Sequence, residues 1–176
     1  MKSLVQAREE SLTVSIFLVF LFSLLMAVAA YVRIPLFFTP VPLTMQTFVL
    51  YLSLAVLGRR AGLVQLMYAA FGACGLAVFT NGGSGLSYLL GPTGGYILGF
   101  LAASLIVSLI MPEKKTFLKS FAVFSVAAVI IYSLGMGWLM ISQGLSFSAV
   151  LAAGLFPFLA GEFIKITAAS FLSARV

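Results

Sequence analysis

Long apolar segments separated by short charged connections constrain the fold of this chain more than any other feature of its sequence. A segment of about 20 apolar residues can cross a bilayer as a helix. Inside hydrocarbon the backbone must satisfy its own hydrogen bonds, which favours helices. We therefore expect an all-α integral membrane protein in which residues 1–176 form one six-span domain. The predicted spans are residues 12–31, 43–58, 61–79, 93–111, 117–141 and 148–174.

Composition excludes several classes of protein. Hydrophobic residues make up 62% of the chain and charged residues 8%, which is far from the balance of a water-soluble domain. The net charge of +6 does not indicate nucleic-acid binding, because the cations lie in short connections between spans. The chain has one cysteine and no histidine, so no internal disulfide, metal site or cofactor is expected.

The basic residues predict the orientation in the membrane. With both termini in the cytoplasm, Arg33 is the one basic residue in an outer connection. The N-terminal segment has a second interpretation, a cleaved secretory signal ending near Ala27-Val28-Ala29. Its length and the preceding Glu9 and Glu10 favour a retained first span. The basic residues placed inside are Lys2, Arg8, Arg59, Arg60, Lys114, Lys115, Lys119 and Arg175.

The first outer connection, residues 33–42, is rich in proline. Pro35, Pro40 and Pro42 lack an amide hydrogen and fix their own φ, so a continuous helix is excluded. The segment is too apolar for a free aqueous loop, and we expect an extended or re-entrant lid across the helix ends. The alternative is an interfacial anchor in which Arg33 reaches lipid phosphate.

The second outer connection is rich in glycine, at residues 81–85 and again at residues 91–96. Glycine lets the backbone approach a small ligand closely. The segment is not a nucleotide-binding loop, because the Gly-Lys-Ser/Thr ending is absent. For Gly94 and Gly95, close packing of helices is favoured over ligand contact.

Glu162 and Lys165 form the one ionisable pair within a predicted span. A spacing of three residues puts both side chains on one face of a helix. Charged groups at this depth are costly and often functional. The pair can bind a polar ligand, or it can be a structural ion pair that fixes helix packing.

Three motifs in the expected order resemble the biotin-specific substrate-binding subunits (the BioY family) of energy-coupling factor transporters. They are Ile34-Pro35-Leu36 with Thr39-Pro40-Val41-Pro42-Leu43-Thr44-Met45-Gln46-Thr47-Phe48, then Gly91-Pro92-Thr93-Gly94-Gly95-Tyr96, and Gly161-Glu162-Phe163-Ile164-Lys165. The resemblance runs from about residue 23 to the C-terminus. One departure is Glu162, because the family usually has aspartate there.

The resemblance implies a six-helix protein of the bacterial cytoplasmic membrane that binds biotin near its outer face. Its partners would be a transmembrane coupling subunit and two cytoplasmic ATPase subunits. Biotin offers a cyclic urea, an apolar ring and chain, and a carboxylate. Glu162 can accept from the ureido N–H groups, and Lys165 can donate to the ureido oxygen or the carboxylate. Other candidate contacts are Gln46, Asn81, Arg33 for the carboxylate, and the walls Phe37, Phe38, Phe79, Tyr88 and Tyr96.

Other functions have less support. Glu162 is the single acidic residue inside a predicted span, and no carboxylate pair or histidine base accompanies it, so the chain is not expected to be an enzyme. No span has the sustained polar stripe of a channel. Two alternatives stay open: a subunit of the same kind that binds another small vitamin, and a small proton-coupled secondary transporter.

Overall fold

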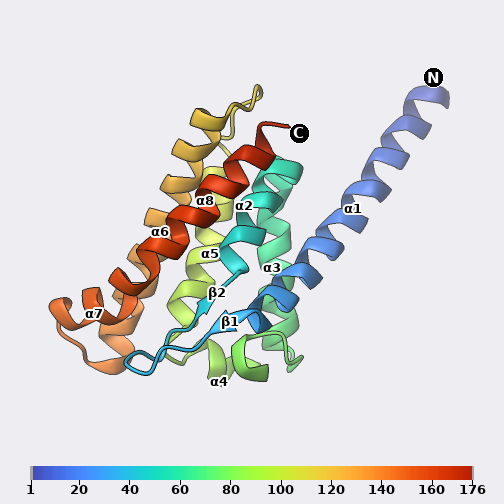
Figure 1. Cartoon of the computed structure of the whole chain (residues 1–176). Helices are drawn as coiled ribbons and strands as arrows, with labels where there is room; N and C mark the ends of the chain where they lie inside the picture. The colour runs from blue at the N-terminus through green and yellow to red at the C-terminus, as the bar shows by residue number, and fades with distance from the viewer. Residues whose placement is uncertain (1, 176) are drawn as a thin grey trace.

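Apolar helices make up most of the chain, which the computed structural model describes for residues 2–175, with side chains from residue 12 onward (Figure 1). The α-helices are α1 Lys2–Tyr31, α2 Gln46–Leu57, α3 Ala61–Ala73, α4 Gly85–Leu89, α5 Gly94–Val107, α6 Phe117–Gln143, α7 Phe147–Gly154 and α8 Leu159–Ser173. Short 3-10 turns are η1 Gly58–Arg60, η2 Thr80–Gly82 and η3 Phe156–Phe158, and two short strands are β1 Arg33–Ile34 and β2 Leu43–Thr44.

Four stretches of the described chain are long and apolar enough to cross a membrane, which supports a multi-pass membrane protein. They are Leu12–Tyr31, Gln46–Ala73, Phe117–Gln143 and Phe147–Ser173, and Gly94–Val107 is a shorter apolar helix. Within the second stretch the chain reverses direction between α2 and α3, which lie side by side (Figure 1). Gly58, with φ of +52°, makes that reversal possible.

The last predicted span, residues 148–174, is not one continuous helix. It is divided into α7 and α8 by Leu155 and the 3-10 turn η3, which contains Pro157. Proline cannot donate the backbone hydrogen bond that would continue a helix, so the break occurs there. The third predicted span also ends early, at Ala73, because Gly75 has φ of +96° and stops the helix.

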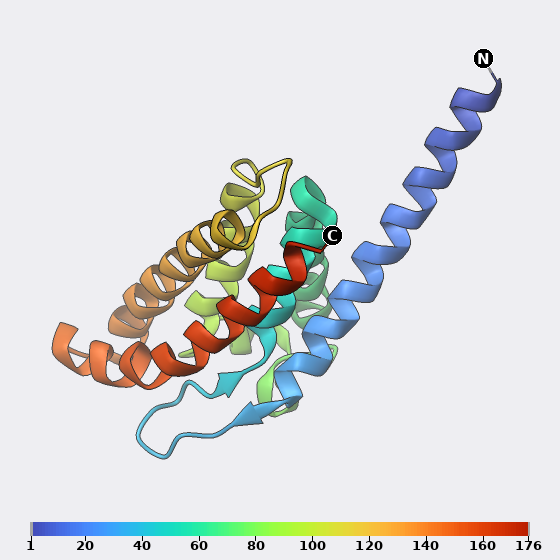
Figure 2. The ribbon, with the colours of Figure 1, turned by 45° about the horizontal axis from the view of Figure 1, so that its top comes forward.

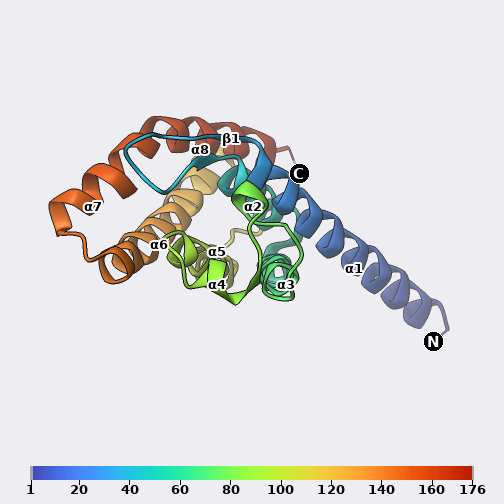
Figure 3. The same ribbon diagram turned by 90° about the horizontal axis from the view of Figure 1, so that it is seen from below.

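The proline-rich segment departs from the all-α expectation. Arg33 pairs with Thr44 and Ile34 with Leu43 in a two-stranded antiparallel ribbon. Figure 3 shows the loop beyond these strands lying across the end of the helical bundle, from α1 toward α7. Pairing of the two strands satisfies backbone groups that no helix could use.

The helix α1 joins the bundle through its C-terminal half. Met26 is fully buried there, and the Ser23 hydroxyl donates to the Val64 carbonyl oxygen of α3 at 3.0 Å. Toward the N-terminus α1 leans away from the other helices (Figure 2), and Leu12, Ile16 and Phe17 are more than half exposed. This end offers an apolar surface to lipid or to another membrane protein.

Close contact between α5 and α6 depends on glycine. A Cβ atom added at Gly99 would lie 2.9 Å from the Cα atom of Ile131, and one at Gly95 would lie 2.8 Å from the carbonyl oxygen of Leu134. Both neighbours are backbone atoms of α6, so they cannot move aside as a flexible side chain could. These distances agree with the packing interpretation of Gly95.

Replacing Gly99 should therefore separate the two helices. We expect Gly99→Ala to lower the free energy of unfolding by about 1–3 kcal/mol, the usual cost of overpacking a core. Thermal melting in detergent, followed by circular dichroism, measures the change. Gly137→Ala is the matched control, because Gly137 lies on α6 with no atom within 4 Å of an added Cβ. Equal melting temperatures for the two variants would contradict this account of the packing.

Candidate ligand-binding site

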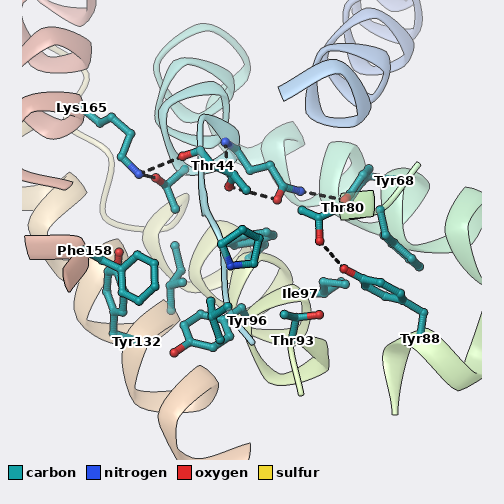
Figure 4. Close-up of a pocket in the computed structure, with 17 residues that line it drawn as sticks. Thr44, Tyr68, Thr80, Tyr88, Thr93, Tyr96, Ile97, Tyr132, Phe158 and Lys165 are labelled. Carbon is teal, nitrogen blue, oxygen red and sulfur yellow. Dashed lines mark hydrogen bonds between the residues drawn. The ribbon is translucent and has the colours of Figure 1, made fainter. Parts of the chain in front are cut away.

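A cavity lies at the end of the bundle that the proline-rich ribbon crosses, and it gathers residues from most parts of the chain (Figure 4). Its lining comprises Val41, Pro42, Thr44, Gln46, Thr47, Tyr68, Phe79, Thr80, Tyr88, Thr93, Tyr96, Ile97, Phe100, Ile131, Tyr132, Phe158 and Lys165. Both outer connections contribute to this set, so the cavity forms only when the ribbon and the glycine-rich segment fold over the helix ends.

Lys165 supplies the positive charge of the cavity. Its ammonium donates to the Thr47 hydroxyl at 2.5 Å and to the Thr44 carbonyl oxygen at 3.2 Å, and it lies 2.6 Å from a Glu162 carboxylate oxygen. An ammonium has three N–H donors, and these three partners use all of them. A ligand acceptor must therefore replace one partner, and the Thr44 carbonyl has the longest bond.

Glu162 lies behind Lys165, outside the cavity lining, and is almost fully buried. Its carboxylate accepts from the hydroxyls of Thr47 at 3.0 Å and Tyr132 at 3.1 Å, and from that of Tyr51. With Lys165, four donors meet a group that has about four acceptor positions. The arrangement holds a buried charge in place without any ligand.

Gln46 is oriented by two neighbours. Its amide nitrogen donates to the Tyr68 hydroxyl oxygen at 2.7 Å, and its amide oxygen accepts from the Thr44 hydroxyl at 3.2 Å. Tyr68 in turn donates to the Val78 carbonyl oxygen at 3.3 Å. One N–H and one lone pair of the Gln46 amide are left, so this side chain can both donate to and accept from a ligand.

Aromatic rings form the remaining walls. Tyr96 and Tyr132 meet edge to face with ring centroids 6.1 Å apart, and Phe79 stacks on Tyr88 at 4.9 Å. The Tyr96 hydroxyl donates to the Gly154 carbonyl oxygen at 2.8 Å, which fixes that ring between α5 and α7. Figure 4 shows Tyr96, Tyr132 and Phe158 on the side of the cavity away from Thr44 and Tyr68. The cavity thus has one polar side and one apolar side.

The structure brings together some of the predicted residues. Lys165, Gln46, Tyr88 and Tyr96 line the cavity, as does Phe79, while Glu162 reaches it through Lys165. Their roles in binding stay predictions.

Other predicted residues lie elsewhere. Arg33 is in strand β1, Phe37 and Phe38 are exposed at the loop beyond it, and Asn81 is exposed. None of the four lines the cavity. Asn81 has φ of +62°, a conformation that asparagine tolerates better than most residues, so its place in the sequence has a purely conformational explanation.

Several hydroxyl groups of the site were not predicted. Thr47, Tyr51 and Tyr132 all donate to Glu162, and Tyr68 orients Gln46. Thr47 and Tyr51 are four residues apart and share one face of the second predicted span, which was an available signal. For Tyr132 the sequence offers none, since a lone tyrosine in an apolar helix is common.

The chemistry of this site favours recognition of a small neutral or anionic polar group attached to an apolar body. Among the described residues, no group of three histidine, cysteine, aspartate or glutamate side chains could hold a metal ion. The acid and the base are engaged with each other and with hydroxyl groups. These contacts hold Lys165 in a fixed position at the cavity wall.

Comparisons with known proteins identify relatives over almost the whole chain. The family model described as "BioY family" matches residues 1–176. The "Biotin transporter BioY" of Thermotoga maritima is 34% identical over 157 residues, covering 89% of this chain and 91% of that protein. The "Probable biotin transporter BioY" of Pyrococcus horikoshii is 33% identical over 160 residues, covering 90% of this chain and 93% of that protein.

A solved structure has the same fold. It is described as the crystal structure of the S-component for biotin from an ECF-type ABC transporter. Its TM-score against this chain is 0.83, with 20% sequence identity, covering 97% of this chain and 92% of that one.

The hydroxyl groups around Glu162 should contribute to stability before any ligand binds. We expect Tyr51→Phe to lower the free energy of unfolding by about 1.5–3 kcal/mol, because it removes a hydrogen bond to a buried charge. The phenylalanine keeps the stacking on Phe124, whose ring centroid lies 5.1 Å away. Tyr31→Phe is the control, since its exposed hydroxyl donates only to a backbone carbonyl. Thermal melting without ligand measures both variants. An equal loss of stability in the two would contradict the expectation.

Proposed function

This chain belongs to the BioY family, and we propose that it binds biotin as the substrate-specificity subunit of an energy-coupling factor transporter. One observation carries the proposal beyond the family. The cavity sets the donors and acceptors of Lys165 and Gln46 on one side and aromatic rings on the other. Biotin has the same division, with a polar cyclic urea and carboxylate joined by an apolar ring and chain.

Lys165 and Gln46 provide the polar recognition in this proposal. A biotin oxygen replaces the Thr44 carbonyl as the third acceptor of Lys165, because that bond, at 3.2 Å, is the longest of the three. The free N–H and lone pair of Gln46 serve the urea, while Tyr88 and Tyr96 enclose the apolar part. Glu162 positions Lys165, because the four donors around its carboxylate leave it little capacity for a ligand.

Uptake requires partners that supply energy. The sequence contains no nucleotide-binding loop, so we propose assembly with a transmembrane coupling subunit and two cytoplasmic ATPase subunits. The chain is a transport protein and not an enzyme. In the bacterial cytoplasmic membrane it would cross six times, through α1, α2, α3, α5, α6 and the α7–α8 pair. The basic η1 turn, the connection before α6 and both ends of the described chain lie at one end of the bundle (Figure 1), which we assign to the cytoplasm.

Calorimetric titration of biotin into the purified protein tests the function. We expect Glu162→Asp to keep binding and Lys165→Gln to weaken it by about 1.5–3 kcal/mol, the scale of a charge-assisted hydrogen bond. Glu162→Gln should weaken binding and also lower the melting temperature, because it leaves the buried Lys165 charge unpaired.

The outcomes separate the roles of Glu162. Weaker binding with an unchanged melting temperature would favour direct contact between Glu162 and biotin. Normal binding in the cold by a Glu162→Gln protein that melts far lower would leave a structural ion pair only. A wild-type protein that binds no biotin but binds another vitamin, or that carries protons with its substrate, would refute the proposal. Mass spectrometry of small molecules retained after mild purification is an independent check.

The orientation in the membrane has its own test. In a Cys74→Ala background, cysteines at Arg59 and Lys114 should be shielded from an impermeant thiol reagent added to intact cells. A cysteine at Ser87, which is exposed on α4 at the opposite end of the bundle, should be labelled. Position 83 is less suitable because a side chain there would meet the Tyr88 ring. Labelling at position 59 from outside would refute the six-crossing arrangement.

A further inference from the structure

A second concave surface, which we call the lateral groove, lies between α6 and α8. These helices run side by side and are connected through α7 (Figures 1 and 3). The groove has a volume of about 560 Å³. It extends along α6 from Phe121 to Tyr132 and, on the other side, from Leu155, which follows α7, to Ile166 of α8. Tyr132 lines both this groove and the cavity, and Glu162 forms part of the groove floor. Tyr132 and Glu162 thus separate the lateral groove from the cavity, and the groove lies on the side of these residues that faces away from the cavity.

The groove offers almost no free hydrogen-bonding capacity. Its three polar lining residues are Ser125, Tyr132 and Glu162. Ser125 donates to the carbonyl oxygen of Phe121 at 2.8 Å within its own helix, and Tyr132 donates to Glu162. The Glu162 carboxylate has the four donors described above. A polar small molecule would find no partner here, so the chemistry selects an apolar occupant.

The groove opens toward the surface that faces lipid. Val129 on α6 is 65% exposed and Phe163 on α8 is 61% exposed, and both line it. These residues continue the exposed apolar surface of two segments long enough to cross a membrane. The twelve helical residues from Phe121 to Tyr132 span about 16 Å along the helix axis. One leaflet of hydrocarbon is about 15 Å thick, half of the usual core, so the two lengths agree.

We propose that the lateral groove binds one acyl chain of a membrane phospholipid, in the leaflet on the side where α6 begins. The lipid chain fills the space behind Glu162 and Tyr132 and completes the wall of the buried site from outside. Water is thereby kept away from the Glu162–Lys165 pair on this side, where the protein alone leaves an open depression. The inference goes beyond the proposed function, because it concerns a ligand taken from the bilayer.

Native mass spectrometry after mild detergent extraction tests this site. Wild-type protein should retain one phospholipid, and Ala160→Phe should lose it because the new ring occupies the groove that Ala160 lines. Ala122→Phe is the matched control, since Ala122 is also exposed but lies outside the groove lining. Thermal melting and biotin titration of each variant show whether it is folded. They also separate failure of this inference from failure of the proposed function.

A second measurement needs no substitution. Wild-type protein in phosphatidylglycerol vesicles doped with a phospholipid that carries a diazirine on its acyl chain should crosslink preferentially within residues 121–132 and 155–166. Equal retention of lipid by all three proteins, or crosslinks spread evenly over α1 and the other exposed helices, would overturn the proposal. So would a wild-type dimer without bound lipid that Ala160→Phe converts to a monomer, because the occupant would then be a second copy of the chain.

Discussion

The hydrogen bonds and the ion pair of the buried Glu162 carboxylate are the interactions on which the rest of this structure depends. It connects α2, through Thr47 and Tyr51, with α6, through Tyr132, and with Lys165 on its own helix. An unpaired charge at this depth would cost several kcal/mol, so the three helices are held where all four donors reach it. Lys165 also donates to the Thr44 carbonyl oxygen in β2. This hydrogen bond connects the ribbon with α8 and helps to hold the ribbon over the helix ends.

The residues around this carboxylate, Glu162 with Lys165 and Tyr132, form a wall between the cavity and the lateral groove, and its two sides differ in polarity. On one side it presents Lys165 to the cavity, which has polar and aromatic surfaces. Toward the membrane it presents an apolar depression. Because the hydrogen bonds within the wall are complete, neither side needs the other to be occupied for the fold to persist. A protein that must bind its ligand, release it and remain folded in a bilayer requires this independence.

Sequence reasoning pointed to residues of the cavity lining where a single unusual residue carried the signal, and their roles in binding stay predictions. Lys165 was a candidate because a cation in an apolar segment is exceptional. Gln46 was a candidate because it lies in one of three motifs that together resemble the family. The hydroxyl groups of Tyr51 and Tyr132 could not be identified in this way. Their role comes from hydrogen bonds to Glu162, which is 111 and 30 residues away in the sequence. The sequence also did not indicate which aromatic side chains would be exposed. Phe37 has the aromatic side chain expected of a cavity wall, yet it lies between β1 and β2 and is fully exposed.

The interruption at Leu155 and Pro157 gives the last segment an electrostatic property that a continuous helix would lack. Because α8 starts anew at Leu159, Glu162 lies in its first turn. The unpaired amides at a helix N-terminus carry a partial positive charge, worth about 0.3–1 kcal/mol to a nearby anion and up to about 2 kcal/mol in a partly buried position. In an unbroken helix that began at Phe147, the same carboxylate would lie about four turns from the N-terminus. The break at Pro157 therefore places the Glu162 carboxylate beside the positive end of a helix dipole.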